Sequence, residues 1–121
     1  MKPDDPRARV VEICTALPEV NARDGQHIAF DVRGKRFAYY LDHHRGDGGL
    51  AVTCKAAAGV QGALVDSDPG RFFVPRYLGP RGWVALRLDV GEVDWDEVER
   101  LLTDAYRMTA PKRLAALVRE P

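Results

Sequence analysis

Four stretches of the chain alternate apolar and polar residues, and this period of two constrains the fold more than any other feature. They lie at 27–32, 36–42, 50–55 and 83–88. Successive side chains of a strand point to opposite faces of a sheet, so this pattern is typical of a strand that is buried on one face. The turn Arg33-Gly34-Lys35 separates the first two stretches and is short enough to close a hairpin. The sequence therefore predicts an antiparallel sheet with one face against a core.

Helical spacing occurs between and around these strands. Val10 begins an apolar series that predicts an amphipathic helix from Pro6 to about Ala16. A short Ala-rich helix is expected over 56–65, weakened by two glycines. The third and clearest helix begins at Asp94, which opens a capping-box pattern, and a last helical piece begins at Pro111.

The order of these elements defines the expected fold class. We expect an α+β domain with an antiparallel sheet of about four to five strands and helices packed on one face. A chain of 121 residues with 45% hydrophobic residues is long and apolar enough to form one core, so a single domain over residues 1–121 is expected. Cys14 and Cys54 form no CxxC motif, and we expect both to be unbonded and buried.

Motifs that carry chemistry are largely missing from the sequence. There is no Walker A loop, GxGxxG, HExxH or GxSxG. The cluster Asp42-His43-His44 with Asp47 resembles a set of metal ligands, but a solvated turn explains it better because adjacent residues point in different directions. His27 lies on the polar side of its strand, where most histidines simply titrate in water. We expect no cofactor, no metal and no enzymatic activity.

The charges are balanced overall but unevenly distributed. The chain has 18 Lys plus Arg and 18 Asp plus Glu, which argues mildly against a dedicated DNA-binding protein. However, residues 71–88 contain four arginines and no acidic residue, whereas residues 89–104 contain seven acidic residues and one arginine. The basic segment also contains four aromatic residues, a composition suited to base stacking and phosphate contact. The competing explanation is that Phe72, Phe73 and Trp83 cap the core while the arginines extend outward into solvent or pair with the acidic helix.

The strand phases suggest which side chains would share the solvent-facing side of the sheet. If Val84, Leu86 and Leu88 are buried, then Trp83 and Arg87 lie on the opposite face. That face is either a docking platform or a plain wet sheet surface. The candidate nucleic-acid-binding residues are Arg36, Tyr40, Lys55, Arg76, Tyr77, Arg81, Trp83 and Arg87.

Several motifs in fixed order resemble a known family. They are Val32-Arg-Gly-Lys-Arg-Phe37, Val52-Thr-Cys-Lys55, Asp66-Ser-Asp-Pro69 continuing to Tyr77, Gly82-Trp83 continuing to Arg87, and Ala110-Pro-Lys-Arg113. In order and spacing they resemble the MmcQ/YjbR family. The resemblance implies a compact α+β domain similar to a double-wing DNA-binding domain, with no agreed catalytic residues or cofactor. The Ala-rich stretch after Lys55 departs from the usual acidic helix of the family.

Three functions remain open from the sequence. The first is a binding module, for DNA or other nucleic acid, that uses the open sheet face and residues 71–87. The second is an interaction protein that pairs with itself or with a protein partner through the same face. The third is an enzyme on a small anionic substrate, with His27 or His43 as the base. The N-terminus has no apolar segment and no stretch is long enough to cross a bilayer, so we expect a cytoplasmic protein without membrane contact.

Overall fold

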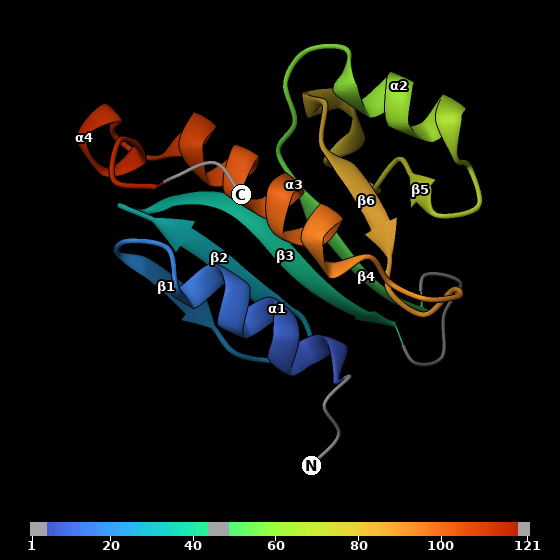
Figure 1. Ribbon diagram of the computed structural model, residues 1–121, viewed down its shortest axis with the longest axis horizontal. Coiled ribbons are helices and arrows are strands. Elements are labelled where there is room, and N and C mark those ends of the chain that lie inside the picture. The colour runs from blue at the N-terminus through green and yellow to red at the C-terminus, as the bar shows by residue number, and fades with distance from the viewer. Residues whose placement is uncertain (1–4, 44–48, 119–121) are drawn as a thin grey trace.

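A six-stranded antiparallel sheet in the order β1-β2-β3-β4-β6-β5 forms the centre of the fold (Figure 1). The computed structural model describes residues 5–43 and 49–118. The sheet and its helices confirm the predicted α+β class, with one or two more strands than expected. The strands are β1 (Val20–Arg23), β2 (Ile28–Val32), β3 (Lys35–His43), β4 (Gly49–Cys54), β5 (Phe72–Phe73) and β6 (Val84–Arg87).

The helices pack against one face of this sheet. The α-helices are α1 (Pro6–Thr15), α2 (Val60–Ser67), α3 (Trp95–Thr109) and α4 (Lys112–Ala115), and a 3-10 turn, η1 (Gly79–Arg81), precedes β6. Helix α3 lies across β3 and β4, α1 lies beside β1, and α2 lies over β5 and β6 (Figure 1). Asp94 caps α3 as predicted, because its carboxylate accepts hydrogen bonds from the backbone N–H of Asp96 and Glu97.

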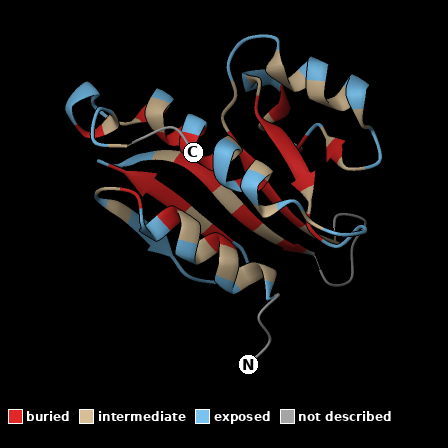
Figure 2. Cartoon of the chain, in the orientation of Figure 1, coloured by how far each residue is buried: buried red, intermediate tan, exposed pale blue. Residues whose placement is uncertain are grey.

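The core lies between the helices and the sheet, and most of the residues in β2, β3, β4 and β6 are buried (Figure 2). Val84, Leu86 and Leu88 belong to the main core cluster, whereas Trp83 and Ala85 are buried outside it, which confirms the predicted phase of this strand. Phe37 of β3 meets Tyr106 of α3 edge to face, with ring centroids 5.7 Å apart. The Tyr106 hydroxyl also donates a hydrogen bond of 2.7 Å to the carbonyl of Pro18, which joins α3 to the segment after α1.

Both cysteines are unbonded and buried, as predicted. Cys14 belongs to α1, and Cys54 ends β4. Burial in the core raises the pKa of the Cys54 thiol to about 12. Burial, together with the neighbouring Cys54, also raises the pKa of Cys14. Each thiol is therefore held in its neutral form at physiological pH.

Three local features differ from the sequence prediction. Strand β5 has only two residues and no residue of β1 is buried, so neither strand was recognised from an alternation of buried and exposed residues. Helix α2 begins at Val60 instead of Ala56, because Gly59 takes a left-handed conformation with φ 86° at the helix start. The predicted hairpin turn is present, and positive φ at both Arg33 and Gly34 is the geometry of a tight two-residue turn.

Candidate functional site

The sheet face opposite the helices, which we term the open face, is the first candidate surface. Cross-strand register places Phe73, Ala85, Thr53, Tyr39 and Ala29 in one row across five strands, and Arg87, Ala51 and Leu41 in the next row. Ala85, Thr53 and Ala51, at the centre of these rows, are fully buried, whereas Ala29 and the large side chains are half-exposed. The large side chains therefore shield the centre of the sheet, and the open face is not a bare wet surface.

The predicted place of Tyr40 on the open face is wrong, and Tyr39 takes that position. Strand β3 has a bulge: Ala38 pairs with Phe30 but Arg36 pairs with Asp31, so β3 holds one extra residue between the two pairs. This residue resets the alternation, which puts Tyr40 on the helix side, where it is 2% exposed. The burial also raises the pKa of Tyr40.

Arg36 lies on the open face, as predicted, but its charge is partly neutralised. Its Nη1 donates to the Tyr39 hydroxyl at 2.7 Å, and the guanidinium lies 5.1 Å from the centre of the Tyr39 ring. Its Nη2 is 3.6 Å from the carboxylate of Asp31, a buried side chain that Arg23 also contacts at 3.3 Å. One carboxylate therefore sits between two arginines, and Arg36 orders the face more than it adds charge.

Trp83 is covered and unable to offer its ring to a ligand in this structure. Its side chain is 3% exposed, and its ring packs against Tyr39 at 6.0 Å with a tilt of 45°. This favours the core-capping interpretation of Trp83 over the base-stacking one. At the other end of β6, Arg87 stacks on Phe73 with 4.4 Å between guanidinium carbon and ring centre, and it stays half-exposed.

The basic segment loses one arginine to the acidic helix. Arg71 contacts Glu97 of α3 and Asp68 after α2, each at 2.6 Å. These two hydrogen bonds raise the pKa of Arg71 above its already high value, so it is permanently charged and paired. The structure thus confirms, for Arg71, the alternative in which an arginine of this segment pairs with the acidic helix.

The remaining exposed cations of this segment lie around an unusual loop at 74–82, which we term the Tyr77 loop. Tyr77 is 89% exposed, and Arg76 and Arg81 are exposed as well. Tyr77 has φ 66°, and the backbone N–H of Leu78 donates to the carbonyl of Arg76 at 2.6 Å, which makes a tight γ-turn with Tyr77 at its centre. This left-handed conformation costs an L-residue about 1–2 kcal/mol, so the rest of the loop must hold it in place.

The neighbouring residues show how the Tyr77 loop is held. The Gly79 N–H donates to the Pro75 carbonyl at 2.9 Å, and Pro75 and Gly79 are both buried. The side-chain amide of Gln61 in α2 donates to the carbonyls of Gly79 and Trp83, at 2.9 and 2.6 Å. Gln61 was not recognised from the sequence, where a lone glutamine in a weak helix carries no signal. The loop is therefore anchored on both sides of its exposed tip.

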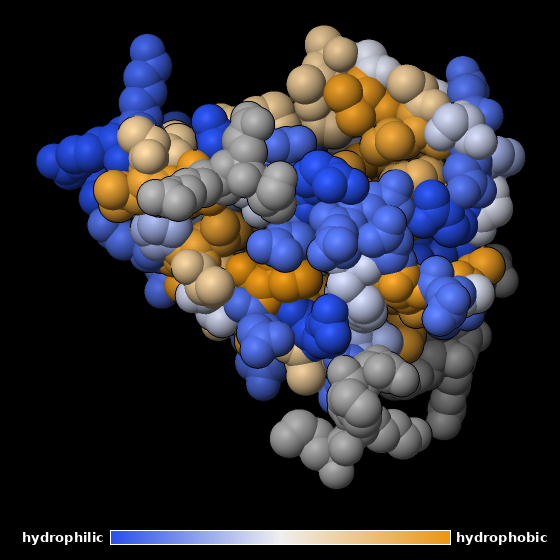
Figure 3. Space-filling model, viewed as in Figure 1, coloured by the Kyte–Doolittle hydropathy of each residue, from blue (hydrophilic) through white to orange (hydrophobic). Residues whose placement is uncertain are grey.

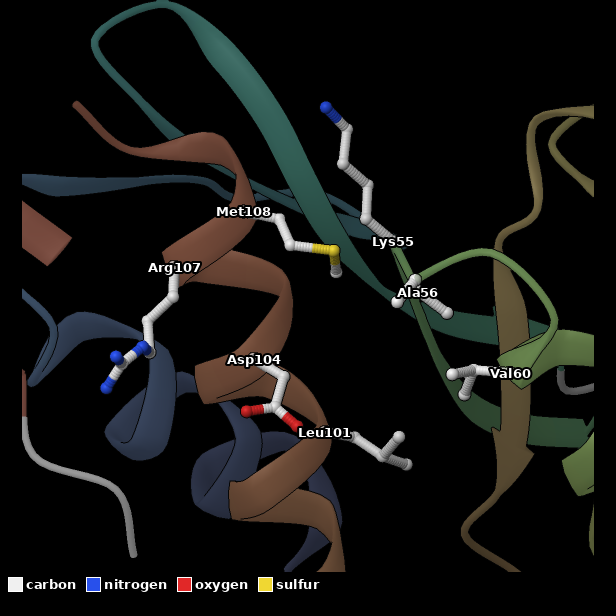
Figure 4. A pocket seen from close by; sticks show the side chains of 8 residues that line it. Lys55, Ala56, Val60, Leu101, Asp104, Arg107 and Met108 are labelled. Carbon is white, nitrogen blue, oxygen red and sulfur yellow. The ribbon is translucent and has the colours of Figure 1, made fainter. Parts of the chain in front are cut away.

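Lys55 lies apart from these groups, beside a groove between α2 and α3. The groove has a volume of about 300 Å³ and is lined by Lys55, Ala56, Ala57, Val60, Leu101, Asp104, Arg107 and Met108. Leu101 and Met108 extend into it from α3, whereas Arg107 and the amine of Lys55 point away (Figure 4). Figure 3 shows a hydrophilic band over α3 and a hydrophobic area beside it toward α2. No histidine lines this groove, so it does not match the predicted enzyme site.

His44, Asp47 and the side chain of His43 lie outside what the structure describes, and no group of three metal-ligating side chains occurs among the described ones. The backbone N–H of Asp42 donates to Nδ1 of His27 at 2.9 Å, so His27 helps to fix the end of β3.

None of the helices in the described part of the chain is long and apolar enough to span a bilayer.

Comparison with known proteins identifies the family. The YjbR family model matches residues 15–108, which include the open face, the Tyr77 loop and most of α3. The chain belongs to the YjbR family. The crystal structure of protein DR2400 of Deinococcus radiodurans, with a domain designated DUF419, superposes with a TM-score of 0.68 at 21% identity, over 82% of this chain and 74% of that one. At this identity the likeness shows the fold. No curated protein matches the sequence.

Proposed function

We propose that this YjbR-family protein is a small cytoplasmic binding protein, without enzymatic activity, that contacts nucleic acid through the Tyr77 loop and the adjoining open face. The observation that carries the proposal is the exposure of Arg76, Tyr77 and Arg81 on one anchored loop. Arginines contact phosphates, and an exposed ring offers a stacking surface for a base. The absence of acidic residues from 71 to 88 keeps repulsion of a polyanion low.

The strength of binding should be modest, because the attractive charge is local. The whole chain has a net charge of zero, and within the basic segment Arg71 is already paired. Arg76, Arg81 and Arg87 remain as phosphate contacts. Three such contacts predict a slope of about −2 to −3 in a plot of log affinity against log salt concentration. An interface that depends on apolar burial would show almost no slope.

The test is fluorescence anisotropy with labelled oligonucleotides, measured from low to physiological salt. The double variant Arg76→Ala/Arg81→Ala should bind more weakly, and the magnitude of its salt slope should be smaller by about two. Arg100→Ala is the matched control, since Arg100 is an exposed arginine on the acidic helix α3 and should not contact a polyanion. Failure of the wild-type protein to bind any oligonucleotide at low salt would refute the proposal.

A second candidate is pairing with another copy or with a protein partner through the same loop. The exposed apolar side chains of Val74 (53%) and Tyr77 favour it, as does the zero net charge. The two candidates differ in an observable way. Sedimentation that shows a dimer, insensitive to salt and weakened by Val74→Asp, would support this second function instead.

A further inference from the structure

The geometry points to Tyr77 as the residue that stacks on an unpaired base, so that the Tyr77 loop selects single-stranded over duplex nucleic acid. This inference rests on the proposed function and specifies its ligand class. It gives the stacking role to Tyr77 and not to Trp83, the candidate six positions later that the strand phase placed on the open face.

Exposure separates Tyr77 from the other aromatic residues of the basic segment. Phe72 and Trp83 are buried, and Phe73 is partly covered by Arg87. The ring of Tyr77 is almost entirely in solvent. A ring can stack on a base when at least one of its two faces is free. Tyr77 is therefore the residue in this segment that is best placed to stack on a base.

The loop holds the backbone from which this ring projects in a fixed conformation. The strained turn at Tyr77 lies between Pro75 and Gly79, both buried, and the Gln61 side chain ties the loop to α2. A further backbone hydrogen bond of 3.4 Å runs from the N–H of Trp83 to the carbonyl of Leu78. Because the turn is already anchored, little backbone entropy is lost when a ligand contacts the ring, which favours a specific contact.

Charge and shape together favour single-stranded over duplex nucleic acid. Arg76 and Arg81 lie on the same short loop as the ring, so phosphates on either side of a stacked base meet cations. In a duplex both faces of each base are covered by neighbouring base pairs, and a side chain reaches only the edges in the grooves. A projecting tyrosine gains its stacking contact only from a strand whose bases are unpaired.

The experiment compares a fluorescein-labelled 12-nucleotide oligo(dT) with a 12-base-pair duplex in anisotropy titrations at low salt. The variants are Tyr77→Gly, which deletes the ring at a positive φ that glycine adopts freely, and Tyr77→Phe, which keeps the ring. Leu117→Ala is the control, because Leu117 is another exposed apolar side chain, far along the chain in the segment after α4. Thermal melts show whether each variant is folded.

We expect the wild-type protein to prefer oligo(dT). Tyr77→Gly should weaken its binding by about 5- to 100-fold, the usual range for one base–aromatic stack, and should change duplex binding less than about twofold. Tyr77→Phe and Leu117→Ala should match the wild type.

Other outcomes overturn the inference. If Tyr77→Gly leaves oligo(dT) binding intact, or weakens both ligands equally, while Arg76→Ala/Arg81→Ala still weakens both, stacking is refuted and the proposed function stands. If Tyr77→Phe loses as much as Tyr77→Gly, the hydroxyl and not the ring makes the contact. If the wild-type protein binds neither ligand, the proposed function fails as well.

Discussion

Replacement of Trp83 by Ala should destabilise the protein strongly. This prediction tests whether Trp83 has a structural role while Tyr77 contacts the ligand. The indole is 3% exposed, so folding removes nearly all of its surface from water. A buried tryptophan covers about 150–250 Å², which at about 25 cal/mol per Å² corresponds to about 4–6 kcal/mol. Alanine retains a small part of this, and large-to-small changes at buried aromatic sites cost about 3–5 kcal/mol.

The lower end of this range applies to Trp83. Its ring packs against the half-exposed Tyr39 on the open face, outside the main core cluster, so the surroundings can partly collapse. A loss of about 3 kcal/mol in a chain of this size should lower the melting temperature by about 10 °C. Trp83→Phe keeps a ring against Tyr39 and should cost less than half as much.

The assay is thermal unfolding followed by circular dichroism, with a urea titration to obtain the free energy of unfolding. Tyr77→Gly is the paired comparison: it should change stability by less than about 1 kcal/mol, because the lost ring is exposed and glycine relieves the positive φ. If Trp83→Ala melts within about 2 °C of the wild type and loses oligonucleotide binding, the indole is a binding residue and our assignment is wrong.

Three further predictions follow from individual contacts. Asp94→Ala should lower stability by about 1 kcal/mol through loss of the α3 N-cap, seen as a lower urea midpoint; Asp94→Asn, which still accepts hydrogen bonds, should retain most of it. A double-mutant cycle on Arg71 and Glu97 should give a coupling of about 0.2–1 kcal/mol that shrinks in 1 M salt, since both side chains are partly exposed; zero coupling would refute a stabilising role for this pair. Cys14 and Cys54 should resist a thiol reagent at pH 8 until the chain unfolds. Their pKa values are raised by folding, so the stability from the protonated thiols is complete below pH 9 and is lost as pH rises toward 12; stability that rises over this range would refute the burial argument.

The sequence was sufficient wherever the cause of a structure lies within a few residues. Alternation over 83–88 identified the buried Val84, Leu86 and Leu88, because a strand has no other way to place such a pattern. Asp94 marked the start of α3, because a cap acts on N–H groups two and three residues away. The family resemblance also came from local motifs in order, and the family match confirms it.

The candidate site depended on contacts between distant residues, which only the tertiary structure decided. Alternation assigned Tyr40 to the open face, but one bulge opposite Phe30 and Asp31 exchanged it with Tyr39. A bulge is set by the pairing of two strands and leaves no mark in either strand alone.

The pairing of charges and the burial of aromatic residues also depended on contacts between distant residues. The sequence showed four arginines beside an acidic helix, yet the pairing of Arg71 with Glu97 spans 26 residues and depends on how α3 crosses the sheet. Trp83 and Tyr77 were both candidate binding residues within one basic segment. Folding buried one under neighbouring side chains and left the other in solvent on a strained turn, because exposure depends on the packing of the whole chain and not on residue type.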